Sequence, residues 1–311
     1  MKLHKLVSTS GLSHEEWLKY RKSGIGGSDA GAVCGLNPYR SPMSVYIDKT
    51  EDFPEVPDNE AMRQGRDLEQ YVADRFCQET GKRVRRANAI YYSADYPFMT
   101  ANVDRLVIGE NAGLECKTAS AYSADKWMEG HIPESYEVQC HHYMAVTGAQ
   151  AWYIACVILG KQFICHRIDR DEGMIHMLTG IEKDFWNNHI VPRIPPGPDG
   201  SKACDEILRK YYPESDHSEK IQLVGFDAQL ERRKEIMELE NKLQTERKTI
   251  EQQIQMYMQE AEAAESDRWK VTWKSFTSSR IDSSRLKAEY PEIYKACVRP
   301  TVSRRFTVKE V

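Results

Sequence analysis

Two neighbouring segments bring carboxylates and a lysine together at a spacing that suits metal-assisted hydrolysis. Asp104 lies on one extended run, residues 109–113 form a glycine-containing turn, and the returning run carries Glu115, Cys116 and Lys117. Side chains alternate between the two faces of a strand, so Glu115 and Lys117 point the same way. If the two runs pair as a hairpin, Asp104 joins them.

A set of this kind is suited to cleaving a phosphodiester bond with Mg²⁺. Magnesium takes carboxylate oxygens, carbonyls and waters as ligands, and the main-chain carbonyl of Cys116 is placed to be one. The ion neutralises charge in the transition state and activates water, and a lysine beside the carboxylates completes the geometry of a metal-and-water site. By itself the E-x-K triplet is a weak signal, because alternating charge on a solvated strand also produces it.

Two flanking helices make the pattern more demanding. Glu69 lies on an amphipathic helix expected over residues 60–80, and Gln139 and Tyr143 share one face of a helix expected over residues 134–148. Taken singly, each residue fits an ordinary helix position. A helix with Glu, a strand with Asp, a strand with E-x-K and a helix with Q-x-x-x-Y, in this order, are rarely found together by chance.

The elements that position these residues predict a mixed α/β fold with a central sheet flanked by helices. We expect strands over residues 83–93, 101–108, 114–118, 151–159 and 161–168, and helices over 13–22, 42–49, 60–80, 123–130, 134–148 and 171–190.

A glycine-rich loop near the N-terminus is a candidate anion site. Residues 24–27 read Gly-Ile-Gly-Gly, and a helix is expected to start there with Ser28 or Asp29 as its N-cap. A helix N-terminus that follows a glycine-rich loop offers N–H groups and a positive dipole end to a phosphate. The alternative is a plain turn in which Ser28 only caps the helix.

Proline and glycine over residues 192–200 mark the end of this first part. We predict a domain over residues 1–195, a linker with a short helix over 196–225, a long helix over 226–267 and a small α/β tail over 268–311. The long helix repeats apolar residues every seven positions, although Glu246 and Gln253 interrupt the seam. It is either a self-associating coiled coil or a helix packed on its own domain. The tail is expected to end in a strand over residues 303–309.

Bulk properties set limits on the class of protein. No apolar run is long enough to span a bilayer and the first residues do not resemble a secretory signal, so a cytoplasmic protein with no membrane partner is expected. The eight cysteines form no C-x-x-C pair and suit reduced thiols rather than an iron–sulfur cluster. His141, His142 and His166 lack ligand-like spacing. A net charge of −4 argues mildly against DNA, unless basic groups gather in a groove.

The motifs resemble those of the YqaJ-like viral recombinase family, which is related to the lambda-type phage exonucleases and to the RecB-like branch of PD-(D/E)XK nucleases. The resemblance covers about residues 12–190. It rests on Arg21 with residues 24–30, on residues 65–69, on Asp104, on residues 115–117 and on residues 139–143; the tail from Trp273 to Phe306 is also similar.

The resemblance implies a PD-(D/E)XK restriction-endonuclease-like core and a role for each matching residue. Asp104 and Glu115 would be the main Mg²⁺ ligands with the Cys116 carbonyl, and Mn²⁺ would substitute. Glu69 would assist a metal directly or through water. Lys117 would orient or deprotonate the attacking water, and Gln139 would help to position the substrate or the lysine. Arg21, Ser28 and Tyr143 would contact the DNA and its 5′-phosphate.

The activity implied is a DNA exonuclease that degrades one strand of linear duplex DNA from the 5′ end. It would leave 3′ overhangs for a single-strand annealing recombinase, as a homotrimeric ring in the cytoplasm of a phage-carrying bacterial host. This sequence differs from the lambda-type enzymes at one phosphate-binding position, where they have an arginine and this chain has Ser123. The difference weakens the expectation of a 5′-phosphate preference. A structure-specific or single-strand endonuclease, or a non-catalytic DNA-end or recombinase-binding module, is the alternative.

Overall fold

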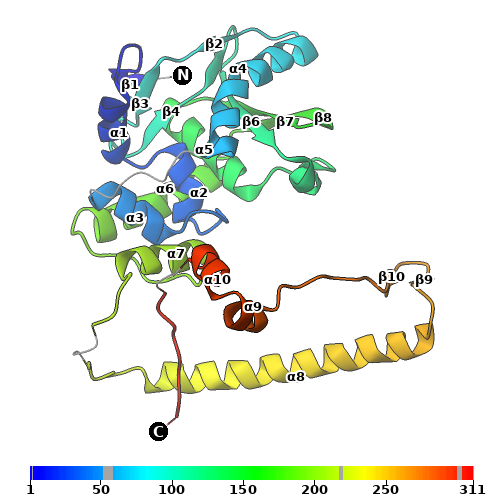
Figure 1. Cartoon of the computed structure of the whole chain (residues 1–311). Helices are drawn as coiled ribbons and strands as arrows, with labels where there is room; N and C mark the ends of the chain where they lie inside the picture. Colours follow the sequence, from blue (N-terminus) through cyan, green and yellow to red (C-terminus); the bar gives the residue numbers. More distant parts are fainter. Residues whose placement is uncertain (2, 52–58, 217–219, 300–302, 311) are drawn as a thin grey trace. The chain divides into compact units, whose positions relative to one another are not determined.

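The computed structural model describes residue 1 and residues 3–51, 59–216, 220–299 and 303–310. The chain divides into two compact units, Met1–Tyr212 and Pro213–Val311 (Figure 1). The first unit contains every predicted site residue. It also contains α7 (Lys202–Tyr211), which lies beyond the expected domain end at residue 195. The domain limits expected from the sequence remain a prediction.

A five-stranded mixed sheet forms the centre of the first unit, in the order β2-β5-β6-β7-β8. Its strands are β2 (Val84–Arg86), β5 (Arg105–Val107), β6 (Ala112–Ala119), β7 (Ala151–Ile158) and β8 (Gln162–Asp169). β6 and β7 run parallel, and the other neighbours are antiparallel. The parallel pair requires a crossover, which α5 (Glu134–Thr147) provides after the 3-10 helix Ala121–Trp127.

One helix covers each face of this sheet (Figure 1). α4 (Glu60–Thr80) buries Val72 and Phe76 against one face, which includes Leu114 of β6 and Tyr153 of β7. α5 covers the opposite face, where its buried residues pack with Trp152, Ile154 and Cys156. The alternation along β7 follows the two-residue period of a strand buried on both faces. Side chains on β6 are thereby divided between α4 and α5.

The helices begin and end where the sequence supplies caps. The Asn59 side chain accepts from the Met62 N–H at the start of α4, and Gly81 ends the helix with φ of +69°. α5 ends at Gly148 in the same left-handed conformation. Gly113 is required for packing, because a Cβ there would lie 2.3 Å from the Trp152 ring. Trp152 in turn packs on Tyr143, with ring centroids 5.1 Å apart.

Two of the predicted strands are each split between two sheets. Residues 83–93 form β2 and β3 (Ala89–Tyr92), and residues 101–108 form β4 (Thr100–Asn102) and β5. β3 and β4 join β1 (His4–Ser8), which the sequence reading missed, in a separate three-stranded sheet. Single strands over these ranges were therefore wrong. These two segments pair with each other in both sheets, β3 with β4 and β2 with β5. Asp104 lies between β4 and β5, where its segment passes from one sheet to the other.

The N-terminal helices are α1 (His14–Lys22), α2 (Gly27–Val33) and α3 (Pro42–Thr50). They pack on one another, and one of them, α2, also packs beside β4 of the three-stranded sheet. Gly26 is the N-cap of α2, so the expected cap at Ser28 or Asp29 was wrong; the Asp29 carboxylate instead accepts from the Gly26 N–H at 3.1 Å. Asp29 is fully buried and pairs with Lys49 at 2.7 Å and with Arg40 at 2.6 Å, which joins α2 to α3.

α6 (Glu172–Phe185) continues into a π-helical turn at Trp186–Ile190. In the second unit, α8 (Asp227–Met258) is a single exposed helix. It is followed by the hairpin β9 (Ala263–Glu265) and β10 (Lys270–Thr272), and by α9 (Ser283–Glu289) and α10 (Pro291–Cys297). The strand expected over residues 303–309 was wrong: these residues form no regular element. In the described part of the chain, no helix is long and apolar enough to cross a membrane.

Candidate active site

Glu115 and Lys117 of β6 point toward α5, because Leu114 and Cys116 occupy the face covered by α4. Glu115 is buried, with 4% of its surface exposed. Its Oε1 accepts from Lys117 Nζ at 2.6 Å and from Gln139 Nε2 at 2.8 Å. Its Oε2 is buried and has no hydrogen-bond partner among the described residues. A buried carboxylate oxygen without a donor is costly unless something positive binds there.

Lys117 is held from three sides. Its ammonium donates to Glu115 and to Gln139 Oε1, the latter at 3.0 Å, and lies 4.5 Å from the centroid of the Tyr136 ring. Burial would lower the pKa of Lys117, but the Glu115 carboxylate, Tyr136 and Asp104 together outweigh burial and raise it. Lys117 is therefore a charged hydrogen-bond donor in this arrangement.

Asp104 lies at the bend before β5, where regular pairing ends. Its Oδ2 accepts from the Cys116 N–H at 2.8 Å, so the side chain takes a main-chain donor that a strand carbonyl would otherwise take. Burial, and then the nearby Glu115 and Glu69 carboxylates, raise the pKa of Asp104 well above its usual value. Carboxylates that repel each other across a buried site favour either a bound proton or a bound cation.

Glu69 reaches this cluster from α4, but its carboxylate is engaged by Arg105. The Arg105 guanidinium is buried, pairs with Glu69 and donates to the Asp104 carbonyl at 2.8 Å. The sequence reading missed Arg105, because an arginine beside an aspartate on a strand reads as a solvated charge and arginine is seldom fully buried.

The donors present fit magnesium. Within the described residues, no three His, Cys, Asp or Glu side chains gather as a metal-holding group. Magnesium does not need such a cage, since one or two carboxylates with carbonyl and water oxygens suffice. The orphaned Glu115 Oε2, the Asp104 carboxylate and the Cys116 carbonyl supply hard oxygen donors of this kind. Cys116 itself is a poor thiolate ligand, because burial and then Asp104 raise its pKa.

Gln139 and Tyr143 form the α5 side of the site. The Gln139 amide donates to Glu115 and, at 2.8 Å, to the Tyr143 hydroxyl. That hydroxyl donates to the Asn102 carbonyl at 3.3 Å. Tyr143 is 4% exposed, so here it holds Gln139; its expected contact with DNA is a prediction that this geometry does not support.

The glycine-rich loop lies against the same helix. A Cβ at Gly27 would stand 2.5 Å from the Tyr143 ring and 3.1 Å from Gln139 Cγ, so only glycine allows this approach. Ser28, the next residue, is exposed. Arg21 lies on α1 with its guanidinium over the Trp17 ring, 5.5 Å from the centroid. The structure thus brings Ser28 close to the active-site helix, and places Arg21 on the neighbouring element.

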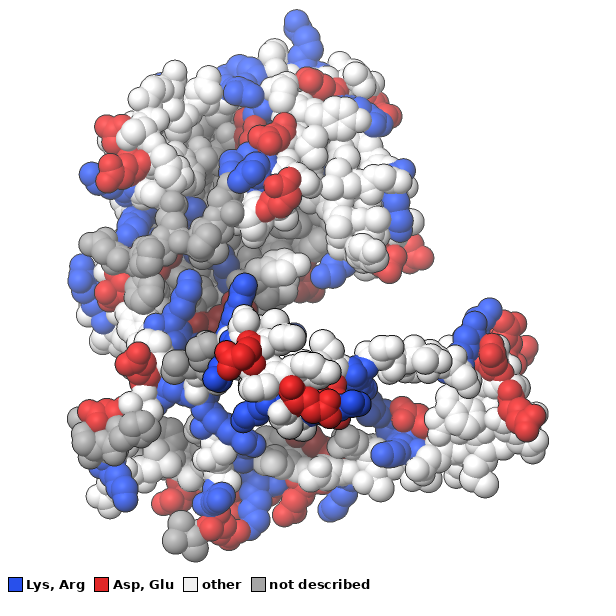
Figure 2. Space-filling view, in the orientation of Figure 1, with Lys and Arg blue, Asp and Glu red and all other residues white. Residues whose placement is uncertain are grey.

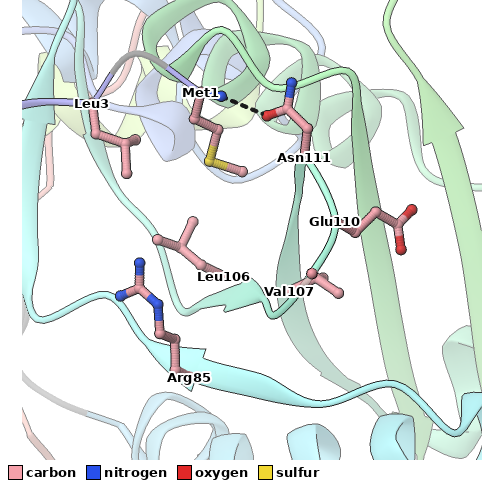
Figure 3. Close-up of a pocket in the computed structure, with 8 residues that line it drawn as sticks. Met1, Leu3, Arg85, Leu106, Val107, Glu110 and Asn111 are labelled. Carbon is pink, nitrogen blue, oxygen red and sulfur yellow. Dashed lines mark hydrogen bonds between the residues drawn. The ribbon is translucent and has the colours of Figure 1, made fainter.

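A pocket elsewhere in the first unit does not include these residues. It lies at the β5–β6 turn, where the Met1 amino group donates to Asn111 Oδ1 at 2.9 Å, and it is lined by Met1, Leu3, Arg85, Leu106, Val107, Gly109, Glu110 and Asn111 (Figure 3). On the face shown in Figure 2, cationic and anionic side chains are interspersed. Neither feature changes the assignment of the site to the β6–α5 face.

The family comparison matches this part of the chain. The model of the YqaJ-like viral recombinase domain matches residues 16–150, which include every predicted site residue. A protein of Bacillus subtilis (strain 168), described as "Uncharacterized protein YqaJ", is 39% identical over 310 residues, covering 98% of this chain and 97% of its own. The chain belongs to the YqaJ-like viral recombinase family.

Solved structures show the fold of this family member. LHK-Exo, an alkaline exonuclease of Laribacter hongkongensis, superposes in its complex with dAMP with a TM-score of 0.50 at 22% identity. The match covers 63% of this chain and 97% of that one. The fold is therefore that of LHK-Exo, and the predicted PD-(D/E)XK core with a mixed sheet between helices is confirmed.

Proposed function

We propose that this protein is a Mg²⁺-dependent exodeoxyribonuclease that hydrolyses linear duplex DNA. The observation that carries the proposal is the state of Glu115. One of its buried oxygens accepts from Lys117 and Gln139, and the other has no hydrogen-bond partner in the part of the chain that the structure describes. Asp104 accepts from the N–H of the next residue, Cys116. An arrangement that leaves a buried carboxylate oxygen unsatisfied is stable when a cation completes it. LHK-Exo is an alkaline exonuclease, and its similar fold supports the same reaction class.

The residues divide the chemistry between them. When bound, Mg²⁺ would neutralise developing charge on the phosphate and lower the pKa of a water. Asp104, Glu115 and the Cys116 carbonyl would hold the ion, and Mn²⁺ is expected to substitute. Lys117, a charged donor fixed by Glu115 and Gln139, would orient the attacking water and stabilise charge on the phosphate oxygens. Gln139 keeps both partners in place.

We also propose that digestion proceeds from a 5′ end. The close approach of Gly27 to Gln139 and Tyr143 supports this, because it sets the exposed Ser28 beside the active-site helix. Arg21 would add a positive charge for the terminal phosphate. Strand removal in this direction leaves a 3′ overhang, the substrate of a single-strand annealing recombinase, and the family's description as viral recombinases supports such a partner.

A ring of three copies is part of the proposal. The chain carries a net charge of −4, so a bulk positive surface is not what would retain DNA. Encirclement of the duplex by a homotrimer would keep the enzyme on its substrate without that surface. The expected location is the cytoplasm of a bacterial host.

Linear and covalently closed duplexes distinguish this function from the alternatives. The protein is incubated with each substrate in Mg²⁺ or EDTA, beside an Asp104→Asn variant. We expect gradual shortening of the linear duplex, in Mg²⁺ only, and intact circles. Cutting of circles would establish an endonuclease instead. Binding of DNA ends by wild type without degradation of any substrate would establish a non-catalytic module and refute the proposal.

A further inference from the structure

Arg105 is buried, although most arginines lie at the protein surface. It is the first residue of β5 and only 3% exposed. It lies directly opposite Leu114 of β6, so its side chain projects toward α4. There Nη1 pairs with Glu69 and donates to the Asp104 carbonyl, while Nη2 donates to Gln70 Oε1 at 3.1 Å. One guanidinium thus ties α4 to the main chain of Asp104.

The negative charges of the site explain why a cationic side chain, Arg105, is buried here. Asp104 accepts from the N–H of Cys116, the residue next to Glu115, and Arg105 joins Glu69 to the Asp104 carbonyl, so three carboxylates gather here. Lys117 compensates Glu115 on the α5 side of the sheet, and Arg105 compensates Glu69 on the α4 side. Among the described residues Arg105 forms hydrogen bonds or ion pairs with Glu69, Gln70 and the Asp104 carbonyl but not with Glu115, so its effect on the site passes through Glu69 and Asp104.

We propose that Arg105 is a positioning residue of the metal site: it fixes Glu69 and the Asp104 main chain so that the Asp104 carboxylate is preorganised beside Glu115. The inference rests on the proposed function. It also gives Glu69 a supporting role, in which its carboxylate is held by Arg105 and would assist the ion directly or through water. Partners that hold metal ligands in place are commonly worth 10-fold to 100-fold in metal affinity.

The sign of the effect separates positioning from simple electrostatics. Arginine is cationic, so removing it from the neighbourhood of a divalent cation would by itself strengthen metal binding. A loss of metal affinity in a folded, charge-removing variant therefore indicates lost positioning of the ligands.

The test is Mg²⁺ binding to the full chain without DNA, measured by titration calorimetry and repeated with Mn²⁺. We expect Arg105→Met to bind either ion about 10-fold or more weakly than wild type. Arg86→Met is the matched control. Arg86 is paired with Arg105 across β2 and β5 and also donates to Gln70, at 3.2 Å, but it is exposed. The Arg86→Met variant should bind both ions with wild-type affinity.

Two further variants keep the test decisive if Arg105→Met fails to fold. Arg105→Lys retains the buried charge but cannot bridge three acceptors, so it should also weaken binding. In a Glu69→Gln background, Arg105→Lys should cost less than it does alone, because the bridge is already weakened. Wild-type affinity in both Arg105 variants, or tighter binding, would overturn the inference. If wild type binds Mg²⁺ and cleaves DNA, that result leaves the proposed function standing; absence of both in wild type refutes the proposed function itself.

Discussion

At the scale of single residues, Lys117 depends on neighbours from two elements. The Glu115 carboxylate on its own strand keeps it charged, and Gln139 and Tyr136 of α5 fix its direction. This lysine can orient water and stabilise anionic oxygen only while those contacts persist. Its contribution to rate should therefore exceed its contribution to stability.

We predict that Lys117→Met lowers the rate of DNA hydrolysis at saturating Mg²⁺ by about 10²–10³-fold, the usual cost of removing one preorganised donor that stabilises charge in the transition state. Methionine fills similar space, so the circular dichroism spectrum should not change. Lys161→Met, at the exposed β7–β8 turn, is the control and should retain full rate. A Lys117→Met enzyme within 10-fold of wild type would remove this lysine from the mechanism.

Residue patterns revealed part of the site and hid the rest. The shared face of Glu115 and Lys117 followed from strand alternation, and the shared face of Gln139 and Tyr143 followed from helix periodicity. Arg105 gave no signal, because its role depends on burial under α4. The unpaired Glu115 Oε2 gave none either, since it is a property of three-dimensional packing.

At the scale of elements, the contact between α2 and α5 connects the glycine-rich loop to the active site. We predict that Gly27→Ala displaces Tyr143 and Gln139, destabilising the fold by about 1–3 kcal/mol and reducing activity. Gly180→Ala, in the interior of α6 with no atom within 4 Å of its Cβ, should instead stabilise by about 0.5–1 kcal/mol. Urea unfolding measures both. Equal effects of the two substitutions would show that α2 does not press on the site.

The buried pair between α2 and α3 should make stability depend on acid. Burial alone would raise the pKa of Asp29, but Lys49 and Arg40 outweigh it and hold the pKa well below its ordinary value of 3.8. A depressed folded-state pKa stabilises the protein above pH 3.8, and this contribution is lost as pH falls further.

Asp29→Asn should therefore lower the free energy of unfolding by about 3–5 kcal/mol at pH 7, because Lys49 stays buried without its partner. The difference in free energy of unfolding between wild type and this variant should become smaller below pH 3.8. Asp48→Asn removes a more exposed partner of Arg40 and should cost about 0–1 kcal/mol. Urea unfolding at several pH values measures these differences. A difference in free energy of unfolding between wild type and Asp29→Asn that does not change with pH would contradict this explanation.

The order of helices and strands along the chain was predictable from the sequence. The strands with which β4 and β5 pair were not. Residues 101–108 carry one extended pattern, yet β4 and β5 belong to different sheets. Local periodicity reports that a segment is extended but not which distant strand it joins. Asp104 stands where the partner changes, and it was found only because its residue type suited a metal. The N-cap of α2 was misplaced because glycine and serine both suit that position.

At the scale of the whole molecule, the first unit contains every predicted site residue, and the second contains the long exposed helix α8. The proposed ring sets a mass for the full chain. We predict that light scattering after gel filtration gives three times the chain mass of 35.9 kDa. A monomer at micromolar concentration would contradict the ring, and DNA retention would then need a localised basic groove.

The measurement that tests the central claim most directly is digestion of 5′-phosphorylated linear duplex DNA by wild type and by Glu115→Gln, in Mg²⁺ and in EDTA. Glutamine keeps the shape of the side chain and an acceptor for Lys117 but removes the charge that would hold the ion. The account predicts that wild type shortens the DNA from its 5′ ends in Mg²⁺ only, and that folded Glu115→Gln does not. Equal digestion by both proteins, or digestion in EDTA, would contradict it.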